Sequence, residues 1–314
     1  ARARAAPSTL LLCAVALLAS TAAQARPLGE RLEIVLGERP LKGARLGILV
    51  AHERDGRVIF ERDADRPLIP ASNMKIMTAI GALSAFGPTH RFETRVLSDR
   101  PPDAAGAVGG LALVGGGDPV LNSEDWWRVA ADLARGGLRR VEGDILVDDS
   151  LFDREYWHPA WSGVSARAYH APVAALTANY GAFFIAIEPG KAPGEPVAVS
   201  VDPPLSYLRI ANMATTGDSD ARRTLSVART MPGEGVEIVQ VRGTVRAGDD
   251  RDEFPRSVRD PALYAGSVFA MQLDALGIEV TGRVRRAKAT LPHVLATHEG
   301  RPLAEVVRLF MKYS

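Results

Sequence analysis

Residues 70–86 read PASNMKIMTAIGALSAF, and this stretch decides how the rest of the chain is interpreted. Its apolar residues Ile76, Ile80 and Leu83 follow the spacing of a helix, and Gly87-Pro88 ends the pattern. Because nearly every side of this helix is apolar, we predict a central, buried helix from Ser72 to Phe86.

Ser72 and Lys75 form the single Ser-x-x-Lys pattern of the chain. Residues three apart share a helix face, so the amine of Lys75 is expected beside the hydroxyl of Ser72. A serine is a poor nucleophile unless a base takes its proton, and a lysine amine in an apolar environment can act as that base. The N-terminus of a helix also favours the negative charge that develops during acyl transfer. In the alternative interpretation Ser72 only caps the helix and Lys75 is a solvated surface residue.

The segment before this helix predicts a short helix and a hairpin. Apolar spacing indicates a helix at 28–36, and strand-like runs at 46–51 and 57–61 flank Asp55-Gly56, a strong hairpin turn. From about residue 94 to residue 290 short alternating runs between Gly, Pro and Asp clusters predict a β-rich region. The clearest expected elements are strands at 111–114, 145–148, 183–187, 197–201 and 236–245, and helices at 126–135, 263–276 and 301–311.

Composition and the first 25 residues restrict the possible functions. The chain has 38 Lys and Arg against 37 Asp and Glu, which argues against a nucleic-acid partner. Arg2 and Arg4, the apolar run at 10–19 and Ala23-Gln24-Ala25 form the pattern of a secretory signal peptide at 1–25, although a buried N-terminal helix is the alternative. We therefore expect a periplasmic or otherwise extracytoplasmic protein with no integral membrane segment after cleavage. The six histidines show no metal spacing, so we expect neither metal nor cofactor.

Several segments resemble one known family in the same order along the chain. Residues 70–75, with Thr78 and Ala79, resemble the active-site helix of the dual D-alanyl-D-alanine carboxypeptidase/endopeptidase family, the class C low-molecular-mass penicillin-binding proteins. The other matching segments are GGGDPVL at 115–121, GDILVDDSLF at 143–152, YHAPVAAL at 169–176 and PLAEVV at 302–307. The resemblance runs from about residue 40 to the last residue.

The resemblance implies an α+β fold with a penicillin-recognising (β-lactamase/transpeptidase-like) domain. We expect this domain at 26–95 and 290–314, incomplete, with a β-rich accessory region inserted at 96–289. Sites of this kind combine Ser-x-x-Lys with a Ser-x-Asn loop and a Lys-Thr-Gly strand. Ser314 matches the first residue of the second motif, and the Lys-Thr-Gly motif is absent. We therefore expect this chain to be a C-terminally truncated, inactive fragment of the enzyme.

The implied activity is hydrolysis of D-alanyl-D-alanine bonds through a Ser72 acyl-enzyme, with Lys75 as the base and Ser314 as a third site residue. The implied partners are peptidoglycan stem peptides and cross-links, and β-lactam antibiotics. Two alternatives stay open, namely a β-lactamase-like esterase and a non-catalytic peptidoglycan-binding or scaffold protein. The long insert disfavours the first alternative, and the missing motifs permit the second.

Overall fold

The computed structural model describes residues 26–161, 163–233 and 235–313, and the chain divides into two compact units at Met74/Lys75. The predicted signal peptide at 1–25 and the predicted site residue Ser314 both lie outside the described residues.

The first unit contains the predicted helix and hairpin. Helix α2 spans Leu28–Leu36, and the short 3-10 helix η1 spans Arg39–Leu41. Strands β1 (Ile48–Ala51) and β2 (Val58–Arg62) pair antiparallel. Gly56 has φ +70°, the left-handed conformation that a tight turn asks of glycine, so the hairpin prediction is confirmed.

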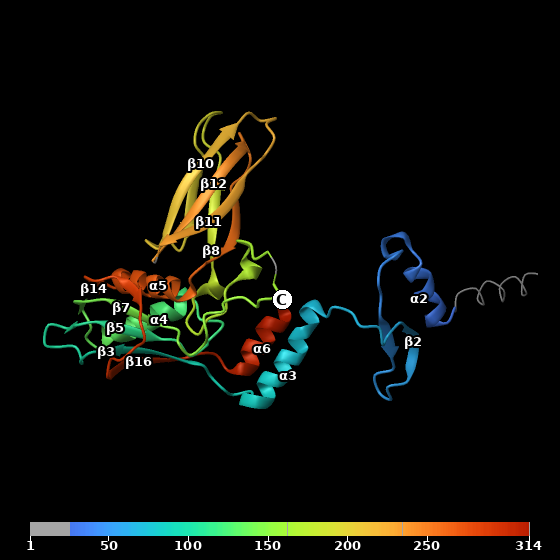
Figure 1. The fold of residues 1–314 in the computed structure, drawn as a ribbon, viewed down its shortest axis with the longest axis horizontal. Helices are drawn as coiled ribbons and strands as arrows, with labels where there is room; N and C mark the ends of the chain where they lie inside the picture. The colour runs from blue at the N-terminus through green and yellow to red at the C-terminus, as the bar shows by residue number, and fades with distance from the viewer. Residues whose placement is uncertain (1–25, 162, 234, 314) are drawn as a thin grey trace, which may run out of the picture. The chain divides into compact units, whose positions relative to one another are not determined.

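A mixed five-stranded sheet forms the base of the second unit (Figure 1). Strand β3 pairs antiparallel with β5 and β16, while β7 pairs parallel with β5 and β15. A smaller parallel sheet has the order β14-β6-β4. The bounds are β3 Glu93–Ser98, β4 Ala107–Val108, β5 Leu111–Val114, β6 Arg140–Val141, β7 Ile145–Asp148, β14 Glu279–Val280, β15 Val284–Arg286 and β16 His293–Glu299.

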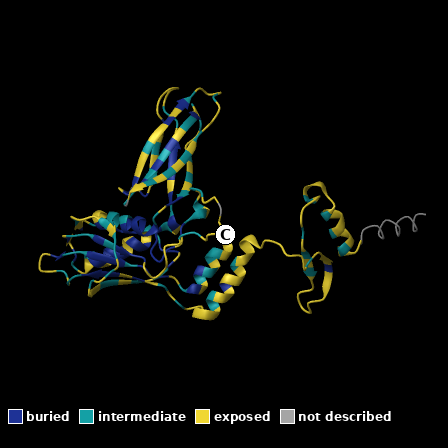
Figure 2. Cartoon of the chain, viewed as in Figure 1, coloured by how far each residue is buried: buried dark blue, intermediate teal, exposed yellow. Residues whose placement is uncertain are grey.

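Two helices, α4 (Ser123–Arg135) and α5 (Pro261–Ala275), pack on each other and on this sheet. Asn122 starts α4 with a capping box, which satisfies backbone N–H groups that a helix N-terminus otherwise leaves unpaired. The rings of Trp126 and Phe269 lie 5.3 Å apart between the helices, and both side chains are fully buried. Figure 2 shows much of this layer in dark blue, and its buried side chains belong to the main hydrophobic core.

Two three-stranded sheets form the β-rich region that projects from α5 (Figure 1). One has the order β13-β8-β9, and the other has β10-β12-β11. The bounds are β8 Ala182–Glu188, β9 Ala198–Asp202, β10 Leu208–Gly217, β11 Ser226–Gly233, β12 Val236–Arg246 and β13 Asp252–Ser257. The prediction of an α+β chain with a β-rich region is confirmed. The expected domain boundaries stay a prediction. The boundary expected between residues 95 and 96 falls within β3, and β3 pairs with β16 from the expected C-terminal segment.

Helix α3 (Met74–Phe86) is not the buried helix that its composition predicts. Ala79 is its one buried residue, while Ile76, Met77 and Ile80 are 48%, 61% and 55% exposed (Figure 2). Among the described residues of the second unit, other side chains cover one face of α3 only. There Ala82 and Leu83 pack against apolar residues of α6 (Leu303–Lys312), which runs beside α3 in Figure 1.

Candidate active site

Ser72 lies in a tight turn before α3 and not in the first turn of the helix as predicted. The turn is the 3-10 helix η2, Ala71–Asn73, in which the Asn73 N–H donates to the Pro70 carbonyl at 2.9 Å. Ala71 has φ +47°, a left-handed conformation that is costly for a residue with a side chain. Such outliers cluster at functional sites, so the turn marks Ser72 as a candidate for function.

Lys75 lies in the first turn of α3 and is half-buried. Its Nζ atom is 6.0 Å from the centre of the Phe310 ring on α6. Since the boundary between the two units falls between Met74 and Lys75, the predicted pairing of Ser72 with Lys75 stays a prediction. The third predicted residue, Ser314, follows Tyr313 outside the described residues.

A cavity of about 660 Å³ lies between α3 and α6. Its walls are mainly apolar, and Lys75 and Thr78 face it from α3. The other lining residues are Ala82, Phe92, Pro119, Val120, Tyr180, Leu303, Val306, Val307, Leu309, Phe310 and Tyr313. A mostly apolar cavity with a few polar groups is the usual form of a small-molecule or peptide site.

The segment between α3 and β3 holds the start of α6 in place. The backbone N–H groups of Leu303 and Ala304 donate to the carbonyls of His90 and Pro88, at 2.8 and 3.0 Å. The guanidinium of Arg91 adds a hydrogen bond of 2.5 Å to the Gly300 carbonyl. These bonds set α6 antiparallel to α3, so the end of α6 lies near Lys75.

The glycine-rich segment at 115–117 has a packing role. A Cβ at Gly116 would lie 1.9 Å from the Glu93 carbonyl oxygen, and Gly117 has φ +85°. Asp118 follows with 3% of its surface exposed and accepts a hydrogen bond from the Val120 N–H at 3.0 Å. Burial raises the pKa of this carboxyl above its ordinary value. These contacts show that the glycines allow a tightly packed turn.

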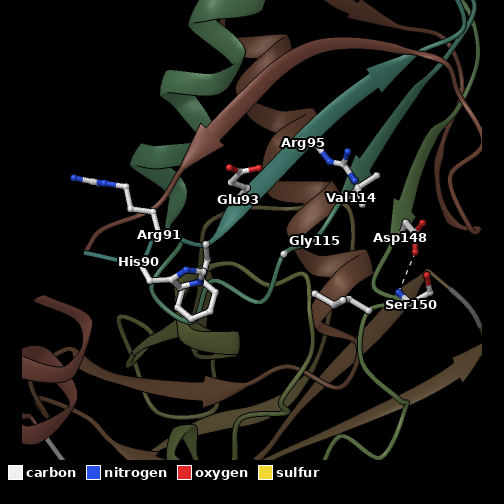
Figure 3. A pocket seen from close by; sticks show the side chains of 11 residues that line it. His90, Arg91, Glu93, Arg95, Val114, Gly115, Asp148 and Ser150 are labelled. Carbon is white, nitrogen blue, oxygen red and sulfur yellow. Dashed lines mark hydrogen bonds between the residues drawn. The ribbon is translucent and has the colours of Figure 1, made fainter. Parts of the chain in front are cut away.

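A second cavity, of about 570 Å³, lies where β3 begins and where β5 and β7 end (Figure 3). Its charged groups include Glu93, Arg95 and Asp148, and the Asp148 oxygens accept backbone hydrogen bonds from Ser150 and Ala289, at 2.9 and 2.8 Å. Burial acts to raise the pKa of Asp148, but the hydrogen bonds from Ser150 and Ala289 outweigh it and hold the pKa below its ordinary value. A carboxylate bound in this way is a poor proton acceptor, so the cavity with Lys75 is the better candidate.

Residues 26–161, 163–233 and 235–313 contain neither a candidate metal site nor a candidate membrane-spanning helix. No group of three or more His, Cys, Asp or Glu side chains there could hold a metal ion. None of the helices there is both long and apolar enough to cross a bilayer.

Sequence patterns alone did not indicate Tyr180 and Tyr313 in the cavity lining or Arg91 at the start of α6. A turn signal, Asn179-Tyr180-Gly181, was the one local pattern that could have drawn attention to Tyr180.

Comparison with known proteins gives concordant results. A model of the D-Ala-D-Ala carboxypeptidase 3 (S13) family matches residues 28–314. The chain is 34% identical over 322 residues to the D-alanyl-D-alanine carboxypeptidase of Actinomadura sp. (strain R39), covering 98% of this chain and 59% of that protein. It is 25% identical to D-alanyl-D-alanine carboxypeptidase DacB of Haemophilus influenzae, covering 87% of this chain and 57% of that protein.

The second of these relatives also has a similar fold. The crystal structure of penicillin-binding protein 4 (dacB) from Haemophilus influenzae superimposes with a TM-score of 0.70 at 24% identity, covering 83% of this chain and 57% of that one. A second structure of that protein, complexed with a novel β-lactam, has a TM-score of 0.65 at 23% identity, covering 83% and 56%. The α+β architecture with its β-rich region is therefore that of this penicillin-binding protein, and the chain spans less than two thirds of the length of these relatives.

Proposed function

Because the chain belongs to the D-Ala-D-Ala carboxypeptidase 3 (S13) family of peptidases, we propose that its gene product is a serine hydrolase of D-alanyl-D-alanine bonds. Its substrates in this proposal are peptidoglycan stem peptides and cross-links, so that it acts as a carboxypeptidase and an endopeptidase. The observation that carries the proposal is the left-handed turn at Ala71, which presents Ser72 directly before α3, three residues ahead of Lys75 in sequence.

The proposed reaction is acyl transfer to Ser72. The Ser72 Oγ attacks the carbonyl carbon of the penultimate D-alanine, and its proton passes to the Lys75 amine. The C–N bond then breaks, and the departing amine takes the proton from Lys75. Water attacks the ester that remains, which releases the shortened peptide and restores Ser72. In this proposal Ser314 supplies a further hydroxyl at the site, as the first residue of the second motif.

The experiment is covalent labelling of the full-length gene product with a fluorescent penicillin. We expect the label on the peptide that contains Ser72, and none on a Ser72→Ala variant. Ser84→Ala is the matched control, because Ser84 is an exposed serine on α3 and its loss should leave labelling unchanged. Undiminished labelling of the Ser72→Ala variant contradicts the assignment.

Export is proposed from residues 1–25 alone. The basic start, the apolar run and the Ala23-Gln24-Ala25 triplet support cleavage between Ala25 and Arg26 and a periplasmic or otherwise extracytoplasmic protein. N-terminal sequencing of exported protein should give Arg26 as the first residue. A first residue upstream of Thr21 is incompatible with this proposal.

A further inference from the structure

Tyr180 occupies an unusual backbone conformation. It has φ +58°, and its neighbours Asn179 and Gly181 have φ +51° and +64°, so three consecutive residues are left-handed. Glycine adopts this conformation freely and asparagine tolerates it, whereas a tyrosine is strained there. Backbone strain persists only where surrounding contacts enforce it, and it is most common at functional sites.

The enforcing contacts involve Asn179 and not the tyrosine ring. The Asn179 Oδ1 accepts a hydrogen bond from the Ser123 N–H at 2.8 Å, and its Nδ2 donates to the Ser123 hydroxyl at 2.8 Å. The Nδ2 also donates to the hydroxyl of the buried Tyr264 at 3.2 Å, and the Asn179 N–H donates to the Leu121 carbonyl at 2.9 Å. The ring of Tyr180 remains 60% exposed, so it contributes little to the stability of the fold.

The exposed ring lines the cavity between α3 and α6. Lys75 and Thr78 face the same cavity from α3, and Phe310 and Tyr313 face it from α6. The strained turn therefore brings a third element, far from both helices in sequence, to the cavity that contains the proposed base. Tyrosine suits such a position, because its ring packs against apolar groups while its hydroxyl remains in water.

We propose that Tyr180 is a specificity-determining residue that contacts the peptide substrate. This inference rests on the proposed function of Ser72 and Lys75. An extended peptide advances about 3.3 Å per residue, so in an extended stem peptide the residues that precede the scissile bond would reach beyond the reacting atoms. The ring packs against their aliphatic atoms. A penicillin is too short to reach this contact. Loss of the Tyr180 ring should therefore weaken binding of the peptide and leave acylation by a penicillin unchanged.

The test uses the full-length gene product and three variants. Tyr180→Asn removes the ring and leaves a residue that tolerates the left-handed turn, and Tyr180→Phe keeps the ring. Trp127→Ala is the matched control, since Trp127 is 45% exposed on α4 and is not among the residues that line the cavity. The measurements are kcat and KM for an N-acetylated pentapeptide ending in D-alanyl-D-alanine, labelling by a fluorescent penicillin, and the melting temperature.

We expect Tyr180→Asn to raise KM about tenfold with kcat within about twofold, as for the loss of one aromatic contact in a binding site. Its melting temperature should not fall below the parental value, and Tyr180→Phe and Trp127→Ala should keep the parental KM. Penicillin labelling should be parental in all three variants. A Tyr180→Asn variant with parental KM overturns the inference, and so does one that loses stability, kcat and labelling together, because Tyr180 is then structural. Absence of labelling in the parent protein contradicts the proposed function itself.

Discussion

The Nζ atom of Lys75 lies 6.0 Å from the centre of the Phe310 ring, at the limit of a cation–π contact. Phe310 belongs to the last turns of α6, whereas Lys75 belongs to the first turn of α3. At the other end of the pair the Ala304 N–H donates to the Pro88 carbonyl at 3.0 Å. Contacts at both ends therefore hold the two helices antiparallel, with the amine of Lys75 at the cavity between them.

The first prediction concerns Lys75→Arg. If Lys75 takes the proton of Ser72, arginine cannot replace it, because a guanidinium remains protonated at any working pH. Acylation by a penicillin should slow by at least about 100-fold, the low end for general-base catalysis, with an unchanged melting temperature. Lys191→Arg, at an exposed lysine, is the control and should acylate at the parental rate. A folded Lys75→Arg variant with a nearly parental rate leaves Lys75 without a catalytic role.

The second prediction concerns a buried ion pair in the β-rich region. Arg229 and Glu237 lie 3.3 Å apart, with 6% and 0% of their side chains exposed. Glu237 also accepts a hydrogen bond from the Tyr207 hydroxyl at 2.9 Å. Burial raises the pKa of Glu237 and lowers the pKa of Arg229, so each charge depends on the other. Arg229→Met should lower the free energy of unfolding by about 3–5 kcal/mol, measured by urea denaturation.

The double variant Arg229→Met/Glu237→Leu should recover most of that loss, because no unpaired charge then remains buried. An exposed pair provides the control. Arg251 and Glu188 lie 3.1 Å apart with 53% and 48% exposed, so Arg251→Met should change stability by about 1 kcal/mol or less. If Arg229→Met and Arg251→Met lower the free energy of unfolding equally, burial does not make the Arg229–Glu237 pair more important for stability than the exposed pair.

The third prediction is a pH dependence that originates at Asp118. Burial raises its folded-state pKa above the ordinary 3.8. Between those two pKa values the folded protein binds a proton that the unfolded chain has released, so stability falls as pH rises through this window. Asp118→Asn has no charge to bury. Its stability relative to the parent should therefore increase from about pH 4 upward and level off above the folded pKa, by urea denaturation at several pH values.

Asp103→Asn should behave in the opposite way. Hydrogen bonds from the Ala107 and Ala105 N–H groups are the main reason that the pKa of Asp103 is lowered. A lowered pKa contributes stability above the ordinary value that is lost as pH falls, so this variant should lose stability relative to the parent as pH rises. If the stability of both variants relative to the parent changes in the same direction as pH rises, burial of Asp118 is not the cause of its pH dependence.

The sequence by itself determined several local elements. Apolar spacing predicted α2 with both of its ends, and Asp55-Gly56 predicted the β1–β2 hairpin. Turn residues around short apolar runs likewise located β5 and β7 with their observed bounds. Each of these depends on residues a few positions apart, so the information lies within the segment itself. The Ser72–Lys75 hypothesis came from the same kind of local pattern.

Only the tertiary structure decided which surfaces are covered and which distant residues meet. Periodicity gave α3 an apolar surface on nearly all sides, but the burial of a helix depends on what packs against it, and the described residues of its unit cover one face. The pairing of β3 with β16 and the arrival of Tyr180 at the cavity with Lys75 join segments far apart in the chain. Such contacts depend on chain topology and on side-chain packing from several elements at once, and no local pattern contains that information.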